Sequence, residues 1–592
     1  MKFSYITEKK QLENIIPILK AEKYLYLDTE VAVKNFKNID FFSDKVRLIQ
    51  IGTEKDIFVI DIFKIGKENI NILKPILEEK GLIGHNLKFD IKFLKTNFDI
   101  FPKIVFDTMI ASQIISEGKD TKHSLLAVSK READLDLDKS QQKSPWHLTD
   151  LLEEQIKYAA NDIEALRQIF PSLKEKLNQM KTPHKATGET KEIFGVENPV
   201  AAVEFTFIPN LALIELKGMP IDKNLLDKML KQLSSEYQSL YIDFFRKYGI
   251  DPFSPQKVAN WLTNKLKLKL PKTEKGSISS QDKYLRKYEN KPEVQKLIEI
   301  RTKKKLLDKV KELNEYITPD LEDENTGRIR SLYRQIGAPT GRMSSSKPNL
   351  QNIPPVLRKL FRPAKNYSMI VADYSQIELR IAAEYTKDQV MINAFKQGLD
   401  LHRFTASLIT GKDYEDITKE ERQMAKAINF GLIYGISPRS LMEYASSSYG
   451  VEISLKEAQI FHEKFFEHYK GFKKWHEETK EKLKNHREIE VVSLLGRRMK
   501  VMKFTDAVNY PIQATGSDML KMAVNFFGKL KKDLDAYIVN LVHDEIIVEA
   551  KEDIKEEAKA ILEESMKKAG EILLKNVPIK YEIEIVTNWS EK

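Results

Sequence analysis

The stretch NLVHDEIIVEA, residues 540–550, places acidic side chains inside a run of strand-forming residues. Apolar residues flank His543, Asp544 and Glu545 on both sides, as in a half-buried pair of strands. Carboxylates at such a position are costly unless a partner compensates their charge. We therefore expect DAYIVNLV and EIIVEA to form a hairpin with His543 and Asp544 at its tip, where a second acid completes a cation site.

The segment SMIVADYSQIELR, residues 368–380, supplies that second acid. Its apolar residues predict a buried strand that delivers Asp373 to the strand's end, just before a turn toward a helix. Asp373 and Asp544 together would form an oxygen cage for two Mg²⁺ ions about 3.5–4 Å apart.

The segment ERQMAKAINFGLIYG, residues 421–435, lies between these acids and has a helical pattern. Arg422, Lys426, Phe430 and Tyr434 recur every four residues and so form a slowly spiralling stripe on one helix. Two cations followed by two aromatic rings suit a triphosphate and a stacked base or sugar. Alone, the pattern is equally typical of an amphipathic helix with a basic face.

A second acidic set lies in the first ~170 residues, where strand and helix patterns alternate as in an α/β domain. Asp28 and Glu30 are two apart in a predicted strand and face the same side. Asp90 lies near the start of a predicted helix, and Tyr158 and Asp162 are four apart on another. Four hard oxygen donors suit a pair of Mg²⁺ or Mn²⁺ ions, and Tyr158 could orient an attacking water. Any one of these acids is more often a helix cap or a surface charge.

The composition limits the class of protein. The 592 residues suggest several domains, and the net charge of +10 permits a nucleic-acid partner. The absence of cysteine excludes disulfides and thiolate sites, and with abundant Lys, Glu and Ile it fits a heat-adapted source. We expect a cytoplasmic protein, bacterial or in a viral host, with an organelle form left open, because neither a secretory signal nor an apolar run of ~20 residues is evident.

The N-terminal motifs DTE, HNLKFD and YAAND resemble, in order and spacing, the DEDD family of 3′–5′ exonucleases, in the subgroup with a tyrosine in its last motif. The resemblance covers about 170 residues and implies a ribonuclease H-like α/β fold. It implies Asp28, Glu30, Asp90 and Asp162 as metal ligands and Tyr158 as the residue that assists the water. Since every carboxylate of the set is present, we expect an active nuclease.

The motifs VADYSQIELR, RQMAKAINFGLIYG and LVHDE resemble, in order, those of the family A, polymerase I-like DNA polymerases. APTGRMSSSKPNLQNIP, DLHRFTA and NYPIQATGSD add further matches from about residue 200 onward. The resemblance implies an α+β right-hand fold behind the exonuclease domain. The expected boundaries are exonuclease 1–172, linker 173–200 and polymerase 201–592, with palm 201–225, 328–385 and 501–592, thumb 226–327 and fingers 386–500.

The resemblance also implies roles for single residues. Asp373, Asp544 and the carbonyl of Tyr374 are implied as metal ligands, and Lys426 as the proton donor to pyrophosphate. The implied nucleotide-binding residues are His402, Arg422, Lys426, Phe430, Tyr434 and Glu378, the last as a steric gate against a 2′-hydroxyl. The implied primer and template contacts are Arg342, Asn349, Gln351, Asn509, Gln513 and His543.

The implied function is template-directed DNA synthesis with 3′–5′ proofreading. We expect two Mg²⁺ ions at each site, with Mn²⁺ as a substitute, and primer–template DNA and dNTPs as partners of a monomer that binds no membrane. Three departures stand out. Thr505 occupies a position where many family members have Arg, so one primer contact is absent or replaced. The exonuclease motifs begin within ~25 residues of Met1, so we expect no 5′-flap cleavage. Phe430, where others have Tyr, implies discrimination against dideoxynucleotides.

Three alternatives compete with this reading. A single-subunit RNA polymerase would share the two aspartates, but Glu378 and Asp28 count against it. A nucleic-acid-binding scaffold with decayed sites would lose unpaired acids first, yet all six are present. An exonuclease whose C-terminal region binds DNA without synthesis conflicts with the intact Asp373, Lys426 and Asp544.

Overall fold

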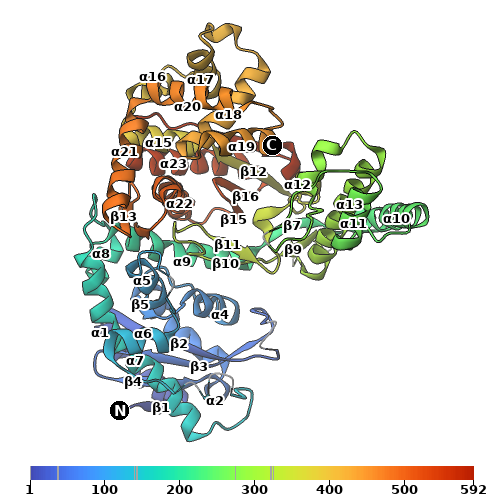
Figure 1. Cartoon of the computed structure of the whole chain (residues 1–592). Coiled ribbons are helices and arrows are strands. Elements are labelled where there is room, and N and C mark those ends of the chain that lie inside the picture. Colours follow the sequence, from blue (N-terminus) through green and yellow to red (C-terminus); the bar gives the residue numbers. More distant parts are fainter. Residues whose placement is uncertain are drawn as a thin grey trace.

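The computed structural model describes residues 2–35, 39–119, 121–138, 140–141, 144–273, 275–320, 323 and 326–592. Figure 1 shows an N-terminal α/β domain below a larger part in which a thumb of long helices projects to one side and a helical fingers region lies at the top. This arrangement agrees with the predicted α/β domain followed by a right hand.

The N-terminal domain is built on a six-stranded mixed sheet with the order β1-β4-β3-β2-β5-β6. Its strands are β1 Ser4–Ile6, β2 Tyr24–Ala32, β3 Lys45–Gly52, β4 Ile57–Asp61, β5 Gly81–Gly84 and β6 Val105–Asp107. Its helices are α1 Lys9–Ala21, α2 Ile62–Ile65, α3 Lys74–Glu79, α4 Lys88–Phe98, α5 Thr108–Ile115, α6 Leu125–Ala133 and α7 Glu153–Gln179. β2 pairs antiparallel with β3 and parallel with β5, so it lies in the middle of the sheet.

The palm is built on a four-stranded antiparallel sheet with the order β15-β16-β12-β17. Its strands are β12 Tyr367–Tyr374, β15 Ala536–Val542, β16 Glu545–Lys551 and β17 Tyr581–Val586. The helices around it are α9 Pro199–Lys217, α14 Pro355–Arg358, α15 Ile377–Thr386, α22 Phe504–Leu530 and α23 Lys555–Leu573. β12 is buried along almost its whole length, because β16 and β17 cover its two edges and α23 packs against it.

The thumb and fingers are mostly helical, as the sequence predicts. The thumb contains α10 Lys223–Tyr248, α11 Pro255–Asn264, α12 Asp282–Leu285 and α13 Pro292–Glu315. The fingers contain α16 Gln389–Lys396, α17 Leu401–Thr410, α18 Lys419–Ile433, α19 Pro438–Tyr449, α20 Leu455–His468 and α21 Lys470–Asn485. The shorter strands are β7 Met219–Asp222, β8 Ile317–Pro319, β9 Thr326–Ile329, β10 Leu332–Arg334, β11 Ser344–Ser346, β13 Ile489–Val492 and β14 Arg498–Val501.

The structure shows how helices and strands lie around the expected domain borders. In the segment expected as a linker, 173–200, α7 continues to Gln179, and a further helix, α8 Glu189–Phe194, buries Phe194. Although this segment is mostly polar, its apolar residues recur at helical spacing and hold it against the N-terminal domain. The predicted borders at 225, 327 and 500 each fall inside an element, namely α10, β9 and β14.

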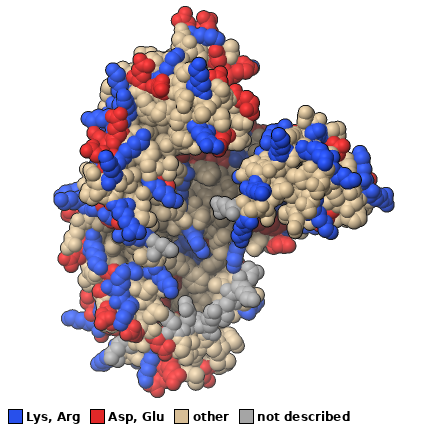
Figure 2. Space-filling model, in the orientation of Figure 1, with Lys and Arg blue, Asp and Glu red and all other residues tan. Residues whose placement is uncertain are grey.

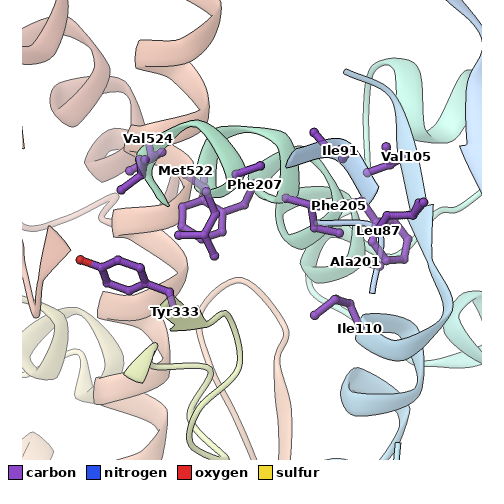
Figure 3. Close-up of a cluster of buried hydrophobic side chains, with 14 of the residues drawn as sticks. Leu87, Ile91, Val105, Ile110, Ala201, Phe205, Phe207, Tyr333, Met522 and Val524 are labelled. Atoms are coloured by element: carbon purple, nitrogen blue, oxygen red, sulfur yellow. The ribbon is translucent and has the colours of Figure 1, made fainter. Parts of the chain in front are cut away.

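Helix α9 is long and largely apolar. By length and composition this helix alone, among the described residues, could cross a membrane. In the structure 67% of its most apolar window is buried. Figure 3 shows why: α9 lies between the two domains, with Leu87, Ile91 and Val105 on one side and Met522 and Val524 on the other.

Candidate active sites

Three of the four predicted exonuclease acids lie together. Asp28 and Glu30 on β2 and Asp162 on α7 place carboxylate oxygens within 4.8 Å of one another. Three carboxylates this close repel unless a proton or a cation lies among them. The donor set therefore fits a hard divalent cation such as Mg²⁺.

Asp90 is not one of that trio, but it lies beside it. It is in the first turn of α4, almost fully buried, and accepts a hydrogen bond of 2.6 Å from the Thr29 hydroxyl. Thr29 is the residue between Asp28 and Glu30 on β2. Burial raises the pKa of Asp90 to about 7, although the bond from Thr29 opposes the rise. A carboxylate held at this cost is typical of a functional site.

Tyr158 lies one turn before Asp162 on α7, as predicted. Burial, followed by the charges of Asp162, Glu30 and Asp28, raises the pKa of its phenol far above the usual value. The hydroxyl therefore stays protonated at neutral pH and can donate a hydrogen bond at the acidic cluster.

The predicted hairpin at the opening stretch is confirmed. β15 and β16 pair antiparallel, with His543 and Asp544 in the turn and His543 at φ +57°. β12 pairs with β16 so that Asp373 is opposite Glu545, and Asp373 and Asp544 line the same cavity of about 990 Å³. Burial, together with the charge of Asp373, raises the pKa of Asp544 to about 6. This donor set also fits a divalent cation.

The partners of these acids were not predicted from the sequence. The ammonium of Lys592 lies 2.8 Å from Asp373 Oδ1, and the indole of Trp589 donates a bond of 2.7 Å to Glu545 Oε1. Both come from the segment after β17, which pairs with β12. No spacing in the sequence indicates these contacts, because sheet pairing alone creates them.

The stripe on α18 faces the same cavity. Arg422, Lys426 and Phe430 all line it. Helix α18 begins at a capping box in which the Thr418 hydroxyl accepts a bond from the Glu421 amide. A similar cap, Asp400, begins α17 and also forms an ion pair of 2.7 Å with Arg422, a partner that the motif reading did not assign.

The imidazole of His402 packs against the ring of Phe430, with the ring centroids 5.7 Å apart. It also lines the cavity, and burial lowers the pKa of its imidazole to about 4, so the ring is neutral at pH 7. Its Nδ1 lies 3.0 Å from the Asn429 side-chain amide. A neutral ring can offer a phosphate a hydrogen bond but no charge.

Glu378 lies in the first turn of α15 and lines the cavity. Its carboxylate forms an ion pair of 2.5 Å with Arg342 and accepts a hydrogen bond from the Tyr434 hydroxyl. Tyr434 follows the last turn of α18 and is not among the described residues that line the cavity. The stripe therefore ends in a contact between fingers and palm.

Only some of the residues expected to contact primer and template line the cavity. Four of them, Arg342, Gln351, Gln513 and His543, line the cavity. Asn349 and Asn509 are not among its described lining residues. The side-chain Oδ1 of Asn349 accepts hydrogen bonds from the Ser345 hydroxyl and from the backbone N–H of Gln351. The buried Oδ1 of Asn509 has no hydrogen-bond partner among the described residues.

Two family models match the chain: DNA polymerase family A at residues 223–591 and 3′–5′ exonuclease at residues 3–178. The chain belongs to DNA polymerase family A. This polymerase is 46% identical to a DNA polymerase I of Aquifex aeolicus, with both chains covered in full. It is 32% identical to the thermostable DNA polymerase I of Thermus filiformis over 72% of its own length and 50% of that chain.

The fold of the polymerase is similar to a solved structure described as the POL domain of Pol1 from M. smegmatis in complex with DNA primer-template and dNTP. The TM-score is 0.81 with 22% identity, and 99% of each chain is covered. The family, the fold class and the enzyme class predicted from the sequence are thereby confirmed. The chain is a template-directed DNA polymerase with a 3′–5′ proofreading exonuclease, both dependent on divalent metal. An exonuclease whose C-terminal region only binds DNA is not favoured.

Proposed function

We propose that the cavity between palm and fingers adds dNMP units to a primer 3′-hydroxyl, and that the Asp28 cluster removes mispaired 3′ nucleotides. The observation that carries this proposal is the pair of acids, Asp373 and Asp544, facing the cationic and aromatic stripe of α18 across one cavity. Two Mg²⁺ ions at each site, with Mn²⁺ as a substitute, would activate the attacking oxygen and neutralise charge on the phosphate.

At the polymerase site Asp373, Asp544 and the Tyr374 carbonyl would hold the cations. Arg422 and His402 would bind the triphosphate, with Arg422 exchanging Asp400 for phosphate. Lys426 would donate a proton to the β-phosphate oxygen that leaves as pyrophosphate. All of these residues are among those that line the cavity.

Around the sugar and base, Phe430 and Tyr434 would form one wall of the nucleotide pocket. Glu378, fixed by Arg342 and Tyr434, would exclude a 2′-hydroxyl. A carboxylate held from both sides cannot move aside, so its position supports discrimination against ribonucleotides.

The primer and template would lie along the hollow between thumb and palm. Figure 2 shows this hollow, with Lys and Arg side chains on the thumb and around its rim. Such charges bind the phosphate backbone without reading sequence. Gln351, Gln513 and His543 would contact the bases nearest the primer terminus, and Asn349 and Asn509 would do so only after a local rearrangement.

At the exonuclease site Asp28, Glu30, Asp90 and Asp162 would hold the cations. Tyr158 would orient the attacking water by donating its hydroxyl hydrogen, because its pKa keeps the proton in place.

We further propose a cytoplasmic monomer, with primer–template DNA and dNTPs as its partners. The buried position of α9 supports a protein that binds no membrane. The Aquifex and Thermus relatives support a heat-adapted source.

Two variants separate the sites. Asp544→Asn removes one polymerase carboxylate, and we expect loss of primer extension with shortening retained. Asp162→Asn removes one exonuclease carboxylate, and we expect the reverse. A labelled primer annealed to DNA reports both activities on one gel. Unchanged extension by Asp544→Asn would show that this acid does not hold a catalytic metal.

A further inference from the structure

Two buried glutamates on α9 connect the helix to different parts of the molecule. Glu204 accepts bonds of 2.7 Å from both Lys521 and Gln335 and also pairs with Arg497, all within the polymerase portion. Glu215 instead pairs with two lysines of the exonuclease domain. Lys88 Nζ lies 2.6 Å from Oε1, and Lys92 Nζ lies 2.5 Å from Oε2.

Both lysines belong to the helix that bears an exonuclease acid. Lys88 and Lys92 are four residues apart on α4 and therefore share one face. Asp90 lies between them and faces the opposite side, toward Thr29. The orientation of α4 is thus set from both sides: by the exonuclease site on one and by Glu215 on the other.

Hydrogen bonds also connect Glu215 to the palm. Its Oε1 accepts a bond of 2.8 Å from the Tyr333 amide, and the Tyr333 carbonyl accepts a bond from Lys88. The Tyr333 hydroxyl donates a bond of 2.6 Å to Asn540 Oδ1 on β15. β15 leads directly into the turn that contains Asp544. Figure 3 shows Tyr333 close to α9 on the palm side of the helix.

Glu215 is buried and forms ion pairs with both lysines. Burial opposes the charge of Glu215, but Lys88 and Lys92 outweigh it and hold the pKa of Glu215 below its usual range. One carboxylate therefore pairs with two ammonium groups, that of the buried Lys92 and that of the partly buried Lys88, and its removal leaves both without this partner.

We propose that Glu215 is a positioning residue that fixes the exonuclease helix α4 relative to the palm strand β15, so that a frayed primer end passes between the two sites without leaving the protein. Glu215 touches no substrate. It keeps the distance and orientation between Asp90 and Asp544 constant. The transfer of a strand from one site to the other requires this fixed arrangement, whereas excision alone and extension alone do not. The proposal rests on the function given above, since both sites must act on one primer.

The test measures hand-over directly. The full-length protein is bound to a labelled primer–template with a mismatched 3′ end, and the reaction is started with Mg²⁺ and an excess of unlabelled trap DNA. The fraction of primers shortened before dissociation is the readout. Excision from free single-stranded DNA and extension of a matched primer are measured in parallel. All variants are compared well below their own Tm.

We expect Glu215→Gln to lower the hand-over fraction at least threefold while single-strand excision and matched extension stay within twofold of the parent. Glu204→Gln is the matched control, because it removes an equally buried charge from the same helix without touching the exonuclease domain; its hand-over fraction should equal the parent's. Tyr333→Phe, which removes only the hydroxyl to Asn540, should lower hand-over in the same direction and serves if Glu215→Gln does not fold.

Hand-over by Glu215→Gln or Tyr333→Phe equal to the parent's would overturn the proposal. An equal loss of hand-over in Glu204→Gln would also overturn it, because it would show that any loss of stability lowers hand-over. A parent protein that neither shortens nor extends primers would instead contradict the proposed function, so the two failures are distinguishable.

Discussion

The substitution Asp544→Asn should stabilise the metal-free protein while it abolishes synthesis. Burial, with added repulsion from Asp373, Glu378 and Glu545, raises the pKa of Asp544 from 3.8 to about 6. At ~1.4 kcal/mol for each tenfold change in proton affinity, holding this carboxylate ionised costs about 3 kcal/mol. Water reaches part of the half-buried side chain, so we expect a recovered stability of about 1–3 kcal/mol.

The pH dependence has a definite sign. Between about pH 4 and pH 6 the unfolded chain has lost this proton while the folded protein keeps it, so stability falls as the pH rises through this window. Above about pH 6 both states are ionised and the full cost persists. Asparagine carries no charge, so its advantage should be absent near pH 4, grow up to about pH 6 and then remain constant.

Urea unfolding in EDTA at about pH 5 and about pH 8 measures the effect. Asp553→Asn makes the same change on an exposed side chain and is the control, for which we expect no change in stability. Equal or lower stability of Asp544→Asn at the higher pH would refute the reasoning, because it would show that the hairpin tip does not hold its acid at a cost.

Two further predictions concern the same cavity. Glu378→Ala should raise the use of ribonucleotides at least tenfold, measured as the ratio of kcat/KM for an rNTP to that for the matching dNTP; an unchanged ratio would remove Glu378 from the gate. Lys592→Ala takes an ammonium group away from Asp373 and should lower the Mg²⁺ concentration for half-maximal synthesis about threefold or more. The Mg²⁺ dependence of excision in the same variant is the internal control, and a parallel shift of both activities would argue against a local effect.

Local patterns predicted the elements that deliver catalytic side chains. The hairpin around Asp544, the strand that ends at Asp373 and the helix that bears Arg422 and Lys426 all follow from periodicity and from the cost of unpaired acids. Each signal lies within about fifteen residues of sequence, where spacing alone determines which face a side chain occupies.

Contacts between distant segments could not be predicted in this way. Lys592 reaches Asp373 only because β17 pairs with β12, and Glu215 meets Lys88 only because α9 packs between two domains. Helix α9 itself shows the limit most clearly. Its apolar composition is common to a membrane span and to a helix buried on all sides, and only tertiary structure distinguishes the two.

One gel assay tests the central claim that a single chain proofreads and synthesises at two metal-dependent sites. A 5′-labelled primer with a mismatched 3′ end is annealed to a DNA template and incubated with Mg²⁺ and either no nucleotides, all four dNTPs or all four rNTPs. We predict shortening without nucleotides, and trimming followed by full extension with dNTPs alone. Extension without any shortening would contradict the exonuclease site, and shortening without extension would contradict the pairing of Asp373 with Asp544.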